Sequence, residues 1–389
     1  MIGERLSASR LRIEMNKRIK FKGPFANLLL ILASLIISVV LIEVFFRIFL
    51  PQDLIIPMPA QEDEELIYRM SPNTKSYIKG TSVRWYHLET NSLGFRDSEY
   101  NFTKSKGTFR VLLLGDSMSM GEGVELQETF IKQFESIIVK KCPNEKIETI
   151  NAAIRGYGTD QALILYQRIG IKFDPDLVIL GFFEGNDFKD NRLGGLFKLD
   201  GEEIIQTIPS EEKSPKYLYY SKQIKIQNFP GYRFFVGHSH FVNFLRKRIA
   251  RLLSSRIVTD SEETEKVVVS PEDWKLTTKI IERWKSYCRD NGSVPLILFL
   301  PTVENLVAIS EGNLDNSRRM DLKMKEFALD NQILWINAVE AMVYESNPAS
   351  FYLKDGHLNP RGHRKLAQKV AQFFIDRNIV CKKNRKNTF

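Results

Sequence analysis

From Phe109 onward, short apolar runs alternate with amphipathic stretches. The runs have the length of buried strands and lie at residues 110–115, 147–151, 176–182, 294–300 and 333–337. Apolar residues recur at helical spacing at 128–141, 160–169, 271–291, 316–331 and 360–377. Strands that alternate with helices are typical of a parallel sheet covered by helices on both faces. The pattern therefore predicts an α/β domain.

The N-terminal end carries a different pattern. Residues 23–42, GPFANLLLILASLIISVVLI, include no charged side chain. Twenty residues span roughly 30 Å as a helix, about the thickness of the hydrocarbon core of a bilayer. A cleaved signal peptide has a shorter apolar run and a small-residue cleavage site, whereas this run continues into Glu43, Phe45 and Arg47. We predict an uncleaved transmembrane helix at residues 25–48, with a buried core helix as the alternative.

The distribution of charge orients this helix. Seven Lys or Arg residues and two Glu residues precede residue 25, so the positive-inside rule places the N-terminus in the cytoplasm and the rest of the chain outside it, in the periplasm or at the cell exterior. The formal net charge of +9 comes entirely from this segment and from four positive residues near the C-terminus. The remainder is close to neutral, which argues against a nucleic-acid partner.

Composition and pattern together predict the domain organisation. The expected parts are a basic cytoplasmic segment (1–24), the transmembrane helix (25–48), a stalk with short strands (49–107), the α/β domain (108–380) and a basic tail (381–389). The strand and helix pattern lapses between residues 190 and 270. An insertion of this length at the edge of a sheet commonly forms a lid or a substrate wall, and we expect that role here.

Three cysteines, Cys142, Cys288 and Cys381, cannot all pair within one chain. We interpret them as incidental, and if the domain is exported, a bridge between Cys142 and Cys288 is the pair that we consider. Neither the cysteines nor His238 and His240, which have no third ligand near them in the sequence, predict a metal centre. We therefore expect no metal and no cofactor.

Small and polar residues follow the predicted strands at their carboxyl ends, where parallel sheets bind ligands. The four groups are Gly115 to Ser117, Gly156 with Gly158, Gly185 to Asp187, and Asp355 with His357. We expect these four loops to converge on one rim of the sheet.

This set of residues suits acyl transfer through a serine. A serine hydroxyl needs a base, and the base needs an acceptor at its second ring nitrogen. We predict Ser117 as nucleophile, His357 as base and Asp355 as its partner. The oxyanion of the tetrahedral intermediate needs preorganised donors, and the candidates are the backbone N–H groups of Ser117 and Gly156 and the side-chain amide of Asn186.

In these blocks the sequence resembles the SGNH hydrolase superfamily, also called GDSL esterases and lipases. The matching positions are Gly-Asp-Ser with Ser117, the glycine Gly156, Gly-Asn-Asp with Asn186, and the late Asp355 and His357. They follow the family's order and spacing over about residues 109–378. The family's usual last block is Asp-x-x-His, whereas this chain has Asp-x-His. The resemblance implies a flavodoxin-like three-layer sandwich with a parallel sheet.

With the anchor, the resemblance implies a membrane-anchored serine esterase or acylhydrolase that acts on O-acyl groups of cell-envelope glycans or lipids. One alternative uses the same residues as an extracytoplasmic O-acyltransferase, with a multispanning acyltransferase as its partner. Another is a non-catalytic anchored scaffold or glycan-binding module. We interpret Asp116 and Asp187 as carboxylates that brace loops, and we do not favour His363 as the base, because it lies inside the last predicted helix.

Overall fold

The computed structural model describes residues 23–52, 54, 58–79, 84–210, 214–254 and 269–381. The chain divides into a smaller unit, Met1–Leu54 with His238–Thr259, and a larger unit, Ile55–Gly237 with Asp260–Phe389. The predicted basic segment before the apolar helix and the basic residues of the predicted tail lie outside the described residues.

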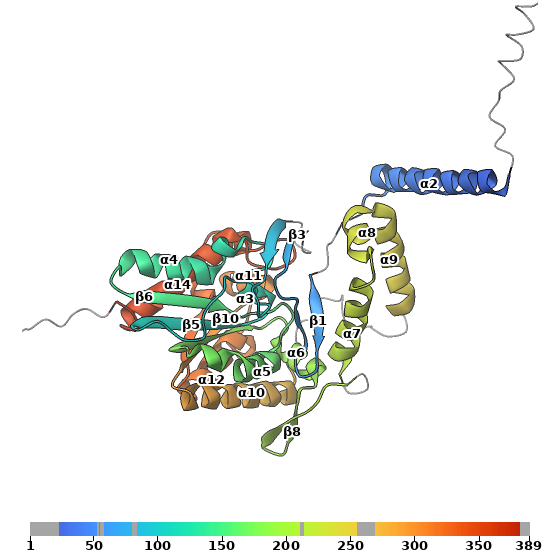
Figure 1. Ribbon diagram of the computed structural model, residues 1–389. Helices are drawn as coiled ribbons and strands as arrows, with labels where there is room; N and C mark the ends of the chain where they lie inside the picture. The colour runs from blue at the N-terminus through green and yellow to red at the C-terminus, as the bar shows by residue number, and fades with distance from the viewer. Residues whose placement is uncertain are drawn as a thin grey trace, which may run out of the picture. The chain divides into compact units, whose positions relative to one another are not determined.

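Five parallel strands form the central sheet of the larger unit (Figure 1). They are β5 (Thr108–Gly115), β6 (Lys146–Asn151), β7 (Leu177–Phe183), β10 (Val294–Leu300) and β11 (Leu334–Asn337). Their order is β11-β10-β7-β5-β6, which is the order of flavodoxin-like folds, with the change of direction between β5 and β7. The parallel sheet predicted from the sequence is confirmed, each strand within two residues of its predicted bounds.

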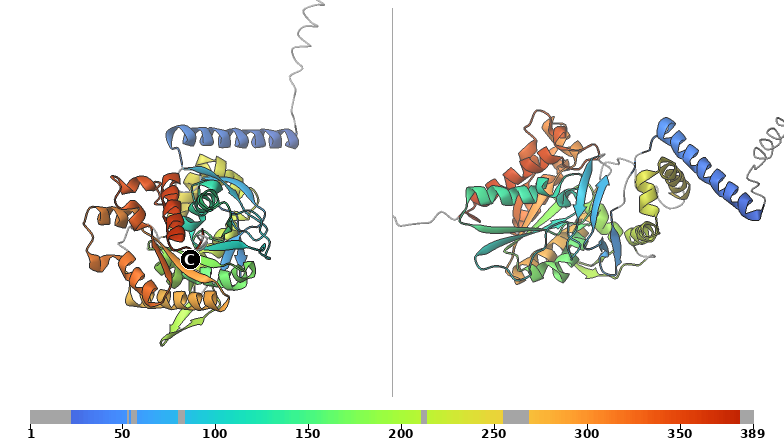
Figure 2. Two further views of the ribbon diagram at one scale, coloured as in Figure 1. Left: turned by 90° about the vertical axis from the view of Figure 1, so that its left-hand side faces the viewer. Right: turned by 45° about the horizontal axis from the view of Figure 1, so that its top comes forward.

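Helices cover both faces of this sheet (Figures 1 and 2). On one face α4 (Phe130–Lys141) packs against α14 (Pro360–Asp376), and on the other α5 (Thr159–Arg168) packs against α10 (Pro271–Asp290). Strands covered on both sides are apolar in nearly every position, and β7 and β10 are buried along almost their whole length. The predicted three-layer sandwich is therefore confirmed.

Shorter elements complete the layers of the larger unit. The helices are α3 (Ser117–Met120), α6 (Asp187–Gly194), α11 (Val303–Ser310), α12 (Met320–Asp330) and α13 (Val339–Met342), with single 3₁₀ turns at Leu126–Glu128, Gly170–Phe173, Asn316–Arg318 and Pro348–Phe351.

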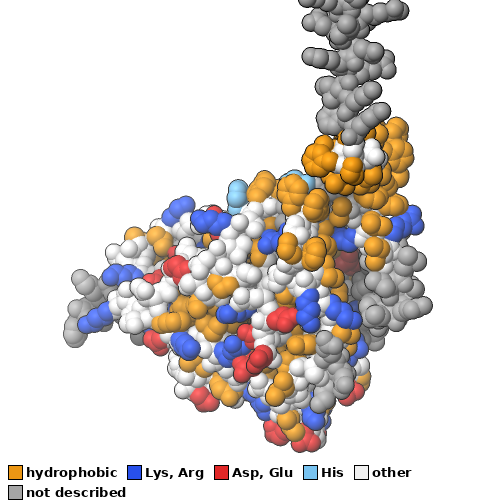
Figure 3. All heavy atoms as spheres, turned by 45° about the vertical axis from the view of Figure 1, so that its right-hand side comes forward, with side chains coloured by type: hydrophobic (Ala, Val, Ile, Leu, Met, Phe, Trp, Pro, Cys, Tyr) orange, Lys and Arg blue, Asp and Glu red, His pale blue; other side chains and the backbone are white. Residues whose placement is uncertain are grey.

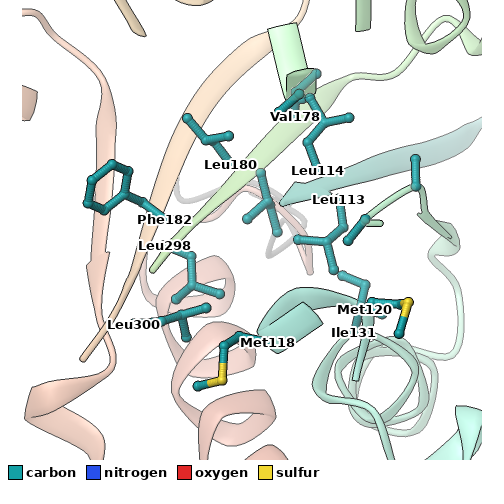
Figure 4. Close-up of a cluster of buried hydrophobic side chains, with 14 of the residues drawn as sticks. Leu113, Leu114, Met118, Met120, Ile131, Val178, Leu180, Phe182, Leu298 and Leu300 are labelled. Atoms are coloured by element: carbon teal, nitrogen blue, oxygen red, sulfur yellow. The ribbon is translucent and has the colours of Figure 1, made fainter. Parts of the chain in front are cut away.

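Helix α3 is anchored in the core through alternate residues. Met118 is 2% exposed and Met120 is fully buried, and Figure 4 shows both side chains among the apolar side chains of the sheet, with Met118 near Leu300 and Met120 near Ile131. Because these two methionines point inward, the short helix is held at the end of β5.

Most of the segment predicted as a stalk, residues 58–79 and 84–107 of those described, is part of the larger unit. It forms two antiparallel hairpins, β1 (Ala60–Asp63) with β2 (Ile67–Met70) and β3 (Lys75–Lys79) with β4 (Trp85–Glu89). Tyr68, Leu88 and Phe95 from this segment are buried in the main hydrophobic core. The expected short strands are present, but they pack into the same core as the sheet.

The region predicted as an insertion holds several elements. They are the hairpin β8 (Phe197–Asp200) with β9 (Glu203–Gln206), and the helices α7 (Pro215–Gln227), α8 (Tyr232–His238) and α9 (His240–Ser254). Helix α7 packs against β1 and β2 in the larger unit.

In the smaller unit, α2 (Pro24–Phe49) is long and apolar enough to cross a membrane, and hydrophobic side chains cover it (Figure 3). Near its C-terminal end, Glu43 accepts hydrogen bonds from Ser239 Oγ (2.7 Å), from the N–H of His240 (2.9 Å) and from the N–H of Phe241 (3.1 Å). The Phe46 ring packs against Phe241, with centroids 5.4 Å apart. The start of α9 is therefore fixed to the end of α2.

Cys142, which follows α4, and Cys381, which follows α14, form a disulfide with Cα atoms 5.4 Å apart. Cys288 on α10 is a buried free thiol. The pairing of Cys142 with Cys288 considered from the sequence is therefore wrong. The physical reason is that α4 and α14 cover one face of the sheet, whereas α10, which carries Cys288, covers the other. The sheet therefore separates Cys288 from Cys142.

This disulfide closes a loop of 239 residues, so it should contribute to stability mainly by restricting the unfolded chain. We expect Cys142→Ser to lower the free energy of unfolding by about 2–5 kcal/mol, measured by denaturant unfolding of the full chain in detergent. A reducing agent should destabilise the wild type and leave the variant unaffected. A wild type that is equally stable with and without reductant would contradict the prediction.

Candidate active site

Ser117 is the first residue of α3 and follows β5 after a single residue, Asp116. Asp116 is the N-cap of this helix, since its Oδ1 accepts a hydrogen bond from the N–H of Met118 (2.9 Å). The first N–H groups of a helix have no acceptor within the helix. The N–H of Ser117, at the start of α3, is therefore not used by the helix itself. The serine predicted as nucleophile is therefore presented at the carboxyl end of a central strand.

Ser119 fills the space between the ends of β5 and β7. A Cβ on Gly115 would lie 2.6 Å from Ser119 Oγ, and a Cβ on Gly181, which pairs with Gly115 in the sheet, would overlap the same oxygen. Only glycine at both strand positions lets α3 approach this closely, which fixes the position of Ser117.

The structure brings Ser117, His357 and Asp355 together. His357 Nε2 lies 2.8 Å from Ser117 Oγ, and His357 Nδ1 lies 3.0 Å from Asp355 Oδ2. The side chains of His357 and Asp355 are 17% and 10% exposed. These contacts follow the order nucleophile, base, acid, which is the arrangement of a Ser-His-Asp triad.

A tight turn explains how Asp-x-His achieves this contact. The N–H of Leu353 donates to the carbonyl oxygen of His357 (2.7 Å), and Gly356 between Asp355 and His357 has a φ of +85°. That left-handed conformation favours glycine. The turn brings Asp355 back beside the imidazole, and Asn359 then caps α14 through the N–H of Gly362 (3.0 Å).

The charges around His357 favour its protonated form. Burial lowers the pKa of His357, but the carboxylates of Asp355, Glu122 and Asp116 raise it by more, so the net shift of the pKa is upward. Glu122 Oε2 lies 3.8 Å from His357 Nε2 and 3.2 Å from the Nε of Arg155. Nearby negative charges stabilise an imidazolium.

Sequence reasoning missed Glu122 and Arg155. Both lie inside the stretches that were singled out, GDSMSMGEGV and RGYGTDQ. The feature of the sequence that could have identified them is a charged residue among small and apolar ones, in a loop that follows a predicted strand.

The candidate oxyanion donors lie on loops that are bound to the same edge of the sheet. The N–H of Ala152 donates to the carbonyl oxygen of Leu113 (2.9 Å), and the N–H of Ile154 to that of Gly115 (3.0 Å). These bonds hold the loop that contains Gly156 against the end of β5. Asn186 follows β7, the other neighbour of β5.

Within the described residues, the N–H of Ser117, the N–H of Gly156 and the side-chain amide of Asn186 donate to no protein group. Asn186 precedes α6 without capping it through its side chain. The three predicted donors are therefore uncommitted, as donors to a substrate oxygen need to be.

Gly156 has two reasons to be glycine. Its φ is +74°, and a Cβ there would lie 2.5 Å from Tyr220 Oη and 2.8 Å from Tyr68 Oη. Tyr68 Oη donates to the carbonyl oxygen of Arg155, and the rings of Tyr68 and Tyr220 stack with centroids 4.0 Å apart. Because Tyr220 belongs to α7, the insertion supplies a side chain beside Gly156.

Asp116 and Asp187 both bind backbone groups. Asp187 Oδ2 accepts from the N–H of Phe183 (2.8 Å), at the end of β7. Burial raises the pKa of Asp116 to about 6. Burial also raises the pKa of Asp187, and the charge of Asp116 adds to this increase. These contacts fit the interpretation that both carboxylates brace loops.

Arg96 is another residue that sequence reasoning missed. Its side chain is buried, and its guanidinium donates to the carbonyl oxygens of Gly121 (2.6 Å), Val124 (2.6 Å) and His87 (3.0 Å). A buried guanidinium needs such acceptors. Arg96 therefore ties the loop after α3 to strand β4.

His363 is buried within the fold. It is 1% exposed, its Nδ1 accepts a hydrogen bond from the N–H of Phe130 (3.2 Å), and burial lowers its pKa to about 3. Across the residues that the structure describes, no group of three or more His, Cys, Asp or Glu side chains is placed to hold a metal ion.

No protein-family model matches the chain, and no curated protein matches it. Similar solved structures include TesA, with 12% identity over 68% of this chain and 97% of TesA and a TM-score of 0.39. A variant of Axe2, an acetyl xylan esterase from Geobacillus stearothermophilus, has 11% identity over 68% of this chain and 93% of its own, with a TM-score of 0.38. The psychrotrophic esterase EstA from Pseudoalteromonas sp. has 11% identity over 70% of this chain and 99% of its own, with a TM-score of 0.36. Since these TM-scores are low, the fold and the site rest on the strand order and the contacts above.

The contacts of His357 predict how its pKa responds to substitution. Asp355→Asn and Glu122→Gln each remove a negative charge that raises this pKa, so both variants should titrate at lower pH than the wild type. The measurement is an NMR titration of the imidazole Cε1–H signals, which the chain's five histidines keep resolvable.

The control for this titration is Glu202→Gln, which removes an exposed carboxylate that pairs with Lys275. It should leave the pKa of His357 unchanged. If Asp355→Asn also leaves that pKa unchanged, the contact between the two side chains does not exist in solution.

Proposed function

We propose that this protein is a membrane-anchored serine ester hydrolase of the SGNH type. The observation that carries the proposal is the 2.8 Å contact between His357 Nε2 and Ser117 Oγ at the carboxyl end of a central strand. Asp355 lies behind the imidazole. The uncommitted donors near the same edge of the sheet supply what an oxyanion needs.

In the proposed reaction, His357 accepts the proton of Ser117 while the serine oxygen attacks the ester carbonyl carbon. The N–H groups of Ser117 and Gly156 and the amide of Asn186 donate to the oxyanion, at about 3 kcal/mol for each donor. The imidazolium, stabilised by Asp355, then protonates the leaving alcohol. Water attacks the acyl-enzyme by the same route, with His357 again as base, and releases the acid and the free serine.

We place the hydrolase on the extracytoplasmic side of a membrane, acting on O-acyl groups of envelope glycans or lipids. Helix α2 supports the anchor, and the excess of Lys and Arg before it supports a cytoplasmic N-terminus. The disulfide between Cys142 and Cys381 supports the same side, because such bonds persist in oxidising compartments.

The nucleophile is tested with Ser117→Ala. We expect a fluorophosphonate probe to label the wild type and not the variant, and hydrolysis of p-nitrophenyl acetate to fall by about 10³-fold or more. The control is Ser286→Ala, which removes an exposed hydroxyl from α10 and should keep both labelling and turnover. Equal labelling of the Ser117→Ala variant and the wild type would reject the proposal.

The anchor is tested in cells. The full chain should remain in the membrane fraction after alkaline extraction, because α2 is long and apolar enough to cross the bilayer as we propose. Protease added to spheroplasts should degrade the domain after α2 while a cytoplasmic marker protein stays intact. Release by alkali would contradict anchoring, and protection from the protease would contradict the orientation.

A further inference from the structure

Arg155 and Glu122 form a charge pair beside the proposed triad that the mechanism above does not use. Arg155 Nε lies 3.2 Å from Glu122 Oε2. The same carboxylate oxygen lies 3.8 Å from His357 Nε2, the nitrogen that contacts Ser117 Oγ. Arg155 is therefore connected to the imidazole through Glu122. In the sequence it directly precedes Gly156, one of the proposed oxyanion donors.

The two partners differ in exposure. The side chain of Glu122 is fully buried, whereas that of Arg155 is 37% exposed. Glu122 thus forms an ion pair with the guanidinium from the buried side, with its Oε2 nearest to Nε. A guanidinium carries five N–H donors, and within the described part of the chain the terminal nitrogens of Arg155 donate to no other group. A planar, pre-oriented set of donors is left at the surface of the site.

The position of Arg155 relative to His357 determines which half of a bound ester its N–H donors contact. His357 Nε2 must hand its proton to the leaving alcohol, so the alcohol oxygen lies beside that nitrogen during the reaction. Glu122 Oε2 lies 3.8 Å from Nε2, and Arg155 pairs with that same oxygen. The acyl oxygen is instead directed to the oxyanion donors. Through Glu122, Arg155 is therefore linked to the side of the imidazole from which the alcohol leaves.

The surrounding charges decide what kind of alcohol fits. Glu122 neutralises Arg155, and the carboxylates of Asp355 and Asp116 act on the same imidazole. The positive charges here are already paired, Arg155 with Glu122 and His357 with Asp355, so an anionic group gains little, whereas neutral oxygens can still accept hydrogen bonds from the guanidinium. Hydroxyl and ring oxygens meet this requirement.

An aromatic residue flanks the same place. The Tyr220 hydroxyl closely approaches Gly156, and its ring stacks on Tyr68, whose hydroxyl donates to the carbonyl oxygen of Arg155. Tyr220 is partly exposed and offers a ring and a hydroxyl together. Arginine donors beside such a ring suit a compact molecule with many hydroxyl groups better than an acyl chain.

We propose that Arg155, positioned by Glu122 and flanked by Tyr220, is a subsite for the alcohol half of the ester, and that this alcohol is a neutral sugar. The inference rests on the proposed ester hydrolysis and narrows its substrate to O-acylated glycans. Arg155 donates hydrogen bonds to sugar oxygens, and Glu122 acts as a positioning residue.

The test compares two acetate esters in the full-length wild type and in Arg155→Met. One is 6-O-acetylglucose, and the other is p-nitrophenyl acetate, whose leaving alcohol carries no other hydroxyl. We expect kcat/KM for the sugar ester to fall about 20-fold or more, mainly through KM, since hydrogen bonds from a charged donor are lost. For p-nitrophenyl acetate we expect a fall of about threefold or less. Arg155→Lys, which keeps the charge but not the planar donor set, should lie between the two proteins on the sugar ester.

The matched control is Arg168→Met. The Arg168 side chain is 35% exposed and pairs with the largely buried Asp63 at 2.6 Å, so this variant breaks a comparable ion pair at the far end of α5. It should keep the wild-type preference between the two esters.

Equal losses on both esters in Arg155→Met, or no loss on either, would overturn the subsite. So would wild-type hydrolysis of dihexanoylphosphatidylcholine that exceeds hydrolysis of 6-O-acetylglucose, since that result indicates a lipid substrate. A wild type that hydrolyses none of these esters would defeat the proposed function itself. Turnover of p-nitrophenyl acetate without a selective loss on the sugar ester defeats only the subsite.

Discussion

The contact between His357 Nε2 and Ser117 Oγ joins residues that lie 240 positions apart in the chain, and the rest of the site depends on it. Ser117 is held by α3, which Met118 and Met120 fix in the core. His357 is held by a turn that leads into α14. Because α14 packs on α4 and the disulfide joins the segments after both helices, the imidazole is supported by the same layer that covers the sheet.

Most of the fold could be predicted from the sequence, because the five strands are apolar runs bounded by turn residues and the covering helices are amphipathic. The order of the strands determines where the site lies, since the loops after β5 and β7 are neighbours at the point where the strand order reverses. Ser117, His357 and Asp355 could be identified because each stands at a predicted strand or helix boundary. The contacts between them fit the predicted roles.

Other features could not be predicted, because their partners are distant in the sequence. The segment around Tyr68 and Leu88 looks like a stalk, since its strands are short, yet its hydrophobic side chains are completed by the main core. Arg96 acquires its role only when the carbonyl groups of Gly121 and Val124 face it. The pairing of Cys142 depends on which face of the sheet each helix covers, and apolar periodicity does not encode that choice.

The packing of Ser119 between two strand ends has a consequence for how this chain can diverge. Gly115, Gly181 and Ser119 share one small volume, so a larger residue at any of the three needs the other two to yield. Such positions change together or remain as they are. Ser117 is not part of this packing, so under the proposed function only the chemistry of its hydroxyl restricts it. In an alignment of distant relatives, co-variation among Gly115, Gly181 and Ser119 would therefore reflect their packing. Invariance of Ser117 would instead reflect the proposed catalytic role of its hydroxyl.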